Sequence, residues 1–209
     1  MKDITVRLES IEIRNFKNVA YGALNFTNPR RACSASILGL YGQNGSGKTA
    51  LIDTVSLLKH LLMGQTIPAK YADCIHVDAP SASFRFCFKI TCSTEPATEY
   101  KVVYECSIRR DTDETAANME QAPKTKVTVF DEVLSASCRC GQQKSRLSAL
   151  IDTRTKKVFL PASKYKILLG KDKFVETDLL VAKKYASATS RFFIFSRELV
   201  SNIRKQCGE

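Results

Sequence analysis

One short segment of the sequence, GQNGSGKT at residues 42–49, combines glycines, a lysine and a hydroxyl in a spacing that suits phosphate binding. It matches the pattern GxxxxGK[ST] in full, with Gly47, Lys48 and Thr49 at its end. Glycine reaches positive φ, so successive backbone N–H groups can converge on one phosphate without a Cβ atom in the way. In this pattern the lysine reaches the β- and γ-phosphates and the hydroxyl binds Mg²⁺. The sequence therefore predicts a P-loop with Thr49 as a magnesium ligand.

We expect the nucleotide to contact the whole segment and the residue after it. Lys48 and Thr49 are the residues expected to contribute to catalysis as well as to binding. ATP is favoured over GTP because no N/T-K-x-D motif, which would read guanine, occurs in the chain. The predicted nucleotide-binding residues of the segment are Gly42, Gln43, Asn44, Gly45, Ser46, Gly47, Lys48, Thr49 and Ala50.

The segments on either side have the pattern that a P-loop requires. Residues 35–42, ASILGLYG, are almost wholly apolar and end at glycine, which predicts a strand buried on both faces. After Thr49 the apolar residues recur at spacings of three and four, which predicts a helix over about 48–62 that ends near Gly64. The apolar residues at these spacings are Leu51, Ile52, Val55, Leu58, Leu61 and Leu62.

Other parts of the chain alternate between apolar and polar residues, as half-buried strands do. Alternation over 4–14 predicts strands at the N-terminus, and alternation over 83–134 predicts an antiparallel meander with one solvated face. Residues 111–125 are polar and predict a loop. Further expectations are a turn at 28–31, a strand at 156–163, and helices at 175–186 and 191–206.

These elements predict an α/β fold, in which a P-loop NTPase core carries an inserted antiparallel β-sheet lobe and C-terminal helices. Residues 1–68 would form the P-loop core and residues 69–165 the β lobe. Residues 166–209 would form a helical segment that continues into a C-terminal half beyond this chain.

A second motif gives a family resemblance. The pattern I-x-I-x-N-F-K, present as Ile11, Ile13, Asn15, Phe16 and Lys17, precedes G-x-N-G-S-G-K-T. Over residues 8–62 the chain resembles the N-terminal half of an ABC-type ATPase head. The group comprises the SMC, Rad50, RecF and OLD proteins and the bacterial AAA-family ATP-binding proteins tied to phage defence.

The resemblance implies roles for several residues. It places Lys17 near the nucleotide phosphates, although a surface lysine at a strand end is an equally good interpretation. It gives Asn44 the place of the family's P-loop asparagine. A glutamine of such heads contacts Mg²⁺ and the attacking water, and Gln142 and Gln143 are the available residues, although a simple polar loop is the preferred interpretation of this pair. The family also implies a homodimer that clamps two ATP molecules between its heads.

Hydrolysis needs a further acidic strand. Residues 127–132, VTVFDE, resemble a Walker B strand in which Asp131 would bind Mg²⁺ and Glu132 would polarise water. The alternation with Lys126 and Thr128 favours a third strand of the meander instead. No LSGG-like signature precedes this segment and no histidine follows it. We therefore expect this chain to bind ATP with little hydrolysis.

The composition of the chain limits the classes of partner that we expect. A net charge of +11 suits a polyanion, so nucleic acid or a nuclease is an expected partner, although a solvated basic surface explains the charge as well. The N-terminus has no apolar signal region and no stretch approaches the about 20 apolar residues of a membrane span, so we expect a cytoplasmic protein without a membrane partner. The eight cysteines show no disulfide spacing.

Two other functions are compatible with a P-loop. A small P-loop kinase would use arginines such as Arg109, Arg110 or Arg139 to clamp phosphates, with Asp131 and Glu132 as its Walker B pair. A nucleic-acid-binding module would use the loop for backbone phosphates alone. The lysine and threonine at the start of the helix favour a nucleotide over this simpler anion site.

Overall fold

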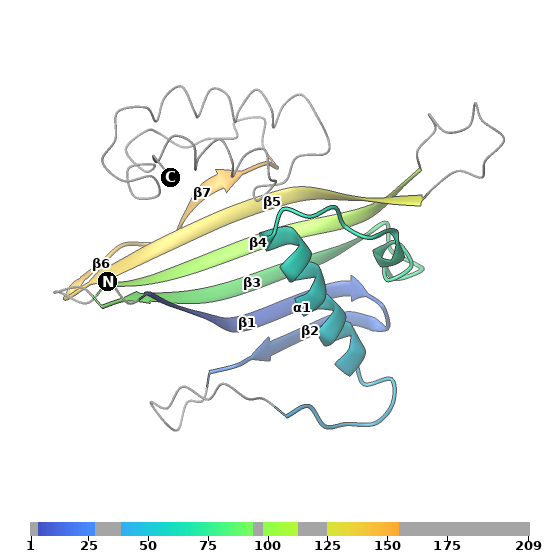
Figure 1. The fold of residues 1–209 in the computed structure, drawn as a ribbon, viewed down its shortest axis with the longest axis horizontal. Helices are drawn as coiled ribbons and strands as arrows, with labels where there is room; N and C mark the ends of the chain where they lie inside the picture. Colours follow the sequence, from blue (N-terminus) through green and yellow to red (C-terminus); the bar gives the residue numbers. More distant parts are fainter. Residues whose placement is uncertain (1–3, 28–38, 94–97, 113–124, 155–209) are drawn as a thin grey trace.

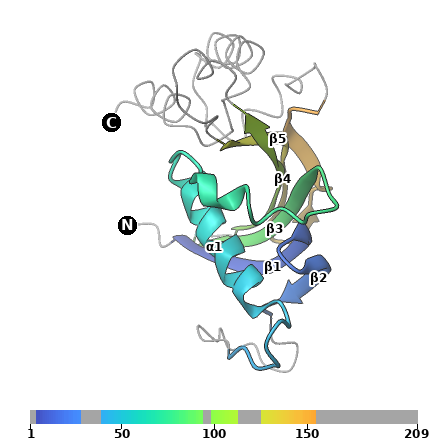
Figure 2. The same ribbon diagram turned by 90° about the vertical axis from the view of Figure 1, so that its right-hand side faces the viewer.

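The computed structural model describes residues 4–27, 39–93, 98–112 and 125–154. In these residues a curved antiparallel sheet carries helix α1 (Lys48–Leu62) across one face (Figures 1 and 2). The strand order is β2-β1-β3-β4-β5-β6, and β7 also pairs with β5. The strands are β1 (Ile4–Phe16), β2 (Val19–Asn25), β3 (Ser81–Cys92), β4 (Thr98–Thr112), β5 (Thr125–Cys140), β6 (Gln143–Lys144) and β7 (Ser148–Asp152), and a 3-10 helix η1 spans Ala69–Tyr71.

A β-bulge in β1 keeps its apolar residues on one face. Val6 and Leu8 stand at even positions, whereas Ile11 and Ile13 stand at odd positions. The register against β3 shifts between Leu8 and Ser10, so that Ile11 lies opposite Phe86 and Leu8 opposite Phe88. One extra residue on the bulged strand restores the alternation to a single face.

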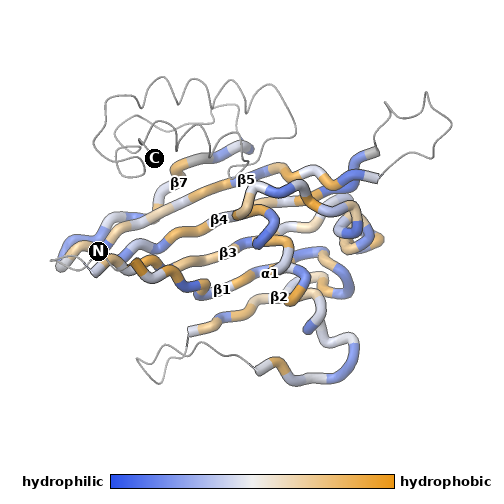
Figure 3. Tube along the Cα trace, in the orientation of Figure 1, coloured by the Kyte–Doolittle hydropathy of each residue, from blue (hydrophilic) through white to orange (hydrophobic). Residues whose placement is uncertain are grey.

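The predicted meander is confirmed. β3 pairs antiparallel with β4, and β4 pairs antiparallel with β5. Hydrophobic and hydrophilic residues alternate along these strands (Figure 3). A second bulge lies in β5, where Asp131, with a φ of 52°, and Glu132 stand opposite the single residue Cys106 of β4.

The predicted helix is confirmed at its stated bounds. Gly64 has a φ of 62°, and two hydrogen bonds end the helix, from Gly64 N–H to Leu61 O and from Gln65 N–H to His60 O. This is the Schellman arrangement that glycine favours. The buried residues of α1 are Ala50, Thr54, Leu57, Leu58 and Leu61.

The buried face of α1 differs from the apolar spacing of the sequence. Ile52 is 60% exposed, and Val55 and Leu62 are exposed as well. Thr54 is buried instead, because its hydroxyl donates a hydrogen bond to Ala50 O at 2.8 Å and is thereby satisfied. The apolar residues of α1 cover a wide arc of the helix, so the sequence does not fix which face is buried. Packing against the sheet determines the buried face.

One core joins the N-terminal strands to the meander. Ile11, Leu57, Phe86 and Tyr104 belong to the same buried cluster, between the sheet and α1. β1 is the neighbour of β3, so the structure does not separate two units at residue 68. The expected P-loop core with its C-terminal helices remains a prediction.

The strand expected at residues 35–42 is not found in its described part. Residues 39–43 form no strand, and Tyr41 is 96% exposed. A strand buried on both faces needs hydrogen-bonded neighbours and a layer on each side. No strand of the described residues pairs with this segment. Residues 35–38, the turn at 28–31, most of the loop at 111–125 and the elements expected at 156–163, 175–186 and 191–206 lie outside the described residues.

Candidate nucleotide-binding site

The predicted P-loop lies at the start of α1 and has the glycine conformations that the pattern requires. Gly42, Gly45 and Gly47 have φ values of 153°, 84° and 88°. A Cβ atom on Gly42 would lie 2.9 Å from Ser46 Oγ, and one on Gly47 would lie 3.0 Å from Val19 Cγ2. A side chain at Gly42 would force the Ser46 hydroxyl to move, and one at Gly47 would be a tight fit against Val19, so the positive φ is the stronger reason for glycine at both positions.

Lys48 and the first turn of α1 make the loop electropositive. The Lys48 ammonium donates hydrogen bonds to Gly42 O at 2.6 Å and to Gln43 O at 2.7 Å. The first turn of α1 has neither an acidic residue nor a side-chain cap. The N–H groups that a helix leaves unpaired at its start therefore point to the same region as the lysine, where they favour an anion.

The hairpin turn between β1 and β2 braces the loop. The Asn18 side-chain amide donates a hydrogen bond to Gly45 O, and the Val19 side chain packs against Gly47. Sequence reasoning missed both residues. Their contacts with the loop join residues more than 25 positions apart in the chain, so no local pattern indicates them. The only signal was their position directly after the motif that ends at Lys17.

Lys17 connects the same turn to α1. Its ammonium forms an ion pair with Asp53, and the hydrogen bond that it donates to this carboxylate raises the pKa of Lys17. Lys17 has a φ of 53°, and its backbone N–H donates to Cys74 O. The described contacts thus make Lys17 a tie between the hairpin and the helix, and its predicted contact with nucleotide phosphates stays a prediction. Asp53 was missed, because nothing in its local sequence pairs it with Lys17.

A cleft of about 540 Å³ runs along β2 beside the loop. Ser46, Gly47 and Lys48 line one side, and Tyr21 and Tyr41 contribute aromatic surface. This volume lies in the range of small-molecule sites, about 300–1,000 Å³. The loop and the cleft together fit a phosphate-bearing ligand, with Thr49 exposed at the start of the helix.

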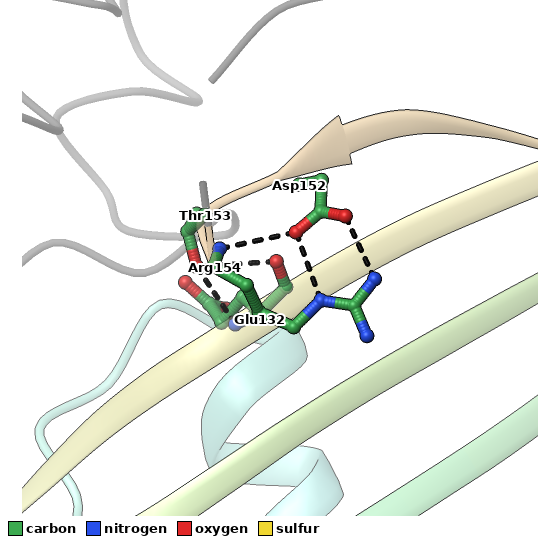
Figure 4. A network of polar contacts seen from close by, with 4 residues as sticks. All are labelled: Glu132, Asp152, Thr153 and Arg154. Carbon is green, nitrogen blue, oxygen red and sulfur yellow. Dashed lines mark hydrogen bonds and ion pairs between the residues drawn. The ribbon is translucent and has the colours of Figure 1, made fainter. Parts of the chain in front are cut away.

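The structure does not bring Asp131 and Glu132 to the P-loop. They lie in β5, three strands from β1 in the sheet, or about 14 Å at the usual strand spacing. Glu132 is 2% exposed and accepts a hydrogen bond from the Tyr104 hydroxyl at 2.5 Å. Burial raises the pKa of Tyr104 well above its usual value. Thr153 holds the Glu132 backbone through hydrogen bonds at 2.8 Å, beside the Asp152–Arg154 ion pair (Figure 4).

This placement predicts that Glu132 stabilises the fold rather than activating water. Glu132→Ala removes an acceptor of a buried hydroxyl, so the free energy of unfolding should fall by about 1–3 kcal/mol in urea titrations. The affinity for Mg²⁺–ATP should stay within about twofold of wild type, because Glu132 is far from the P-loop and substitutions at distant sites act independently. The matched control is Asp131→Asn at the neighbouring exposed carboxylate, because asparagine tolerates its positive φ. A loss of nucleotide affinity without loss of stability would contradict the structural role.

The glutamine pair lies at the opposite end of the sheet. Gln142 is in the exposed turn between β5 and β6, and Gln143 begins β6. The register places this end beside the start of β1, about 40 Å along the strand direction from the hairpin that braces the loop. The described structure does not bring either glutamine together with the P-loop.

The arginines considered for a kinase lid have other contacts. Arg110 donates hydrogen bonds to Ala72 O at 3.0 Å and Ile75 O at 2.6 Å, which holds the segment after α1. Arg109 lies 5.2 Å over the ring of Phe130. Arg139 is in β5, near the end of the sheet that is far from the loop. The structure gives no specific support to the kinase.

Comparison with known proteins gives one short similarity. The chain is 39% identical over 61 residues to the DNA replication and repair protein RecF of Deinococcus radiodurans. The match covers 29% of this chain and 14% of that protein. No family model matches the sequence. The similarity relates the chain, at a coarse level, to the ABC/SMC-like ATPases.

The described residues also bear on metals and membranes. No group of three or more histidine, cysteine or acidic side chains among them could hold a metal ion. Within the same residues, no helix has the length and apolar character needed to cross a membrane.

Proposed function

We propose that this chain is the ATP-binding N-terminal portion of an ABC/SMC-like ATPase. The observation that carries the proposal is the P-loop at the start of α1, in which three glycines have positive φ and the Lys48 ammonium is bonded to the carbonyls of Gly42 and Gln43. The similarity to RecF supports the coarse assignment.

Different residues of the loop would bind different parts of the nucleotide. The backbone N–H groups of residues 43–50 would face the phosphates, and Lys48 would exchange the carbonyls of Gly42 and Gln43 for phosphate oxygens. Thr49 would bind Mg²⁺ through its hydroxyl. Bound ATP would supply the triphosphate charge that holds the loop and its surroundings in one conformation.

The function of the complete protein is proposed as a conformational switch. Two heads would close as a homodimer around ATP and open after hydrolysis, with nucleic acid or a nuclease as partner. We expect this chain alone to hydrolyse ATP slowly, because the carboxylates and glutamines considered for water activation lie away from the loop in the described structure.

Titration with ATP, with and without Mg²⁺, tests the proposal through Thr49. Wild-type protein should bind ATP more tightly with Mg²⁺, and Thr49→Ala should lose this enhancement while its affinity in EDTA stays unchanged. Thr49→Ser keeps the hydroxyl and should restore the wild-type response. Binding that is indifferent to Mg²⁺ and to both variants would overturn the assignment. ADP release that requires a small acceptor would support the kinase instead.

A further inference from the structure

The outer face of the sheet, opposite α1, has charges that are balanced at its centre. Arg85 lies there with its Nη1 2.8 Å from Glu12 Oε1. Its Nε is 3.1 Å from Glu105 Oε1, an ion pair without the alignment of a hydrogen bond. Two carboxylates thus surround one guanidinium, and the centre of this face offers no excess of positive charge.

The end of the same face near β6 is different. Arg7 of β1 lies directly opposite Lys89 of β3, and Lys89 lies directly opposite Lys101 of β4. Residues directly opposite on adjacent strands share a face, with Cβ atoms about 4.5–5.5 Å apart. Three cations therefore form a row across three strands, which we call the cationic row. The next row of the register adds Arg139 and Lys144, with Glu99 between Thr91 and Arg139.

Within the described residues, acidic side chains neutralise only part of the positive charge at this end of the sheet. Glu99 forms an ion pair with Lys89 at 2.8 Å. Arg7, Lys101, Arg139 and Lys144 are exposed, and no ion pair to them occurs in the described part of the chain. Like charges directly opposite each other destabilise a sheet. Glu99 offsets this repulsion at Lys89 alone, so the described contacts remove only part of the cost that the cationic row carries.

We propose that the cationic row and its neighbours Arg139 and Lys144 form a binding surface for the phosphate backbone of nucleic acid. This surface would bind the nucleic-acid partner of the proposed function, and the choice of nucleic acid as the class of partner rests on that function. The strand spacing sets the cations about 4.8 Å apart, on a scale similar to that of the charges of a nucleic-acid strand. Thr5, Thr91 and Ser137 stand in the same two rows and supply hydroxyl donors for phosphate oxygens.

A nucleic acid suits this surface better than an anionic membrane does. Peripheral membrane binding needs apolar side chains that enter the acyl region beside the basic ones. The two rows contain only charged and hydroxyl residues between β1 and β6. Binding would therefore depend on charge and on salt.

Charge reversal tests the surface. Arg7→Glu and Lys101→Glu should each weaken binding of labelled oligothymidine or labelled duplex DNA about 10-fold in fluorescence anisotropy. The slope of log K against log salt should fall by about one for each contact removed. The control is Lys59→Glu, an exposed residue of α1 that makes the same change in net charge, from +11 to +9. It should leave binding within about twofold.

Thermal stability separates binding from folding. Arg7→Glu places a carboxylate opposite Lys89, so Tm should rise by about 1–3 °C while nucleic-acid affinity falls. Lys48→Ala should leave nucleic-acid affinity unchanged, so a failure of the P-loop and a failure of this surface give different results. Equal losses for Lys59→Glu and Lys101→Glu would overturn the proposal. So would binding to phosphatidylserine vesicles, but not to nucleic acid, that depends on Arg7 and Lys101.

Discussion

Lys48→Ala should weaken binding of Mg²⁺–ATP by about 10- to 150-fold. A hydrogen bond to a charged group contributes about 1.5–3 kcal/mol, and each 1.4 kcal/mol is a factor of ten in affinity. The ammonium lies within the loop, bonded to the carbonyls of Gly42 and Gln43, so it is already at the place where phosphates would bind. Isothermal titration of wild type and variant measures the difference.

The matched control for this result is Lys59→Ala. Lys59 is an exposed lysine in the last turn of the same helix, so its loss changes the net charge equally without touching the loop. The control should bind Mg²⁺–ATP as wild type does, and both variants should unfold at wild-type urea concentrations. Wild-type affinity in Lys48→Ala would remove the basis of the proposed function.

Phe16→Ala should lower the free energy of unfolding by about 3–5 kcal/mol, a large share of the about 5–15 kcal/mol that a domain has. Phe16 is 0% exposed. Its ring meets Phe84 edge-on at 5.1 Å between centroids and stacks on Tyr71 at 6.5 Å. Its backbone also forms a bridge with Ile75, so the residue joins β1 to the segment after α1.

The same substitution should reduce nucleotide affinity although Phe16 does not line the cleft. Lys17 and Asn18 follow it directly and hold α1 and the loop. Urea titrations measure the stability, and Tyr41→Ala is the control, because a surface residue outside the core should change it by less than about 0.5 kcal/mol. A loss below about 1 kcal/mol for Phe16→Ala would show that the hairpin does not depend on this core contact.

The asparagine-phenylalanine-lysine motif thus has a structural explanation in the described residues. Asn15 has a positive φ and its carbonyl accepts a hydrogen bond from His76 N–H, Phe16 is core, and Lys17 connects the hairpin to α1 through Asp53. Asn18, the residue after the motif, supports the loop. The sequence could show that these residues precede the P-loop. It could not show which of them faces the loop, because the direction of each side chain depends on the hairpin turn and its positive φ.

The sequence by itself determined the features that depend on neighbouring residues. The glycines of residues 42–47, the helix over Lys48–Leu62 and the strands of the meander follow from local conformational freedom and from the period of apolar residues. Tertiary structure decided what depends on distant partners. Packing against the sheet determines which face of α1 is buried, and β-bulges set the register of β1 and β5. Strand pairing also places the buried Glu132 carboxylate next to the Tyr104 hydroxyl. Only strand pairing brings Arg7, Lys89 and Lys101 into one row, because residues far apart in the chain become neighbours when backbone hydrogen bonds align their strands.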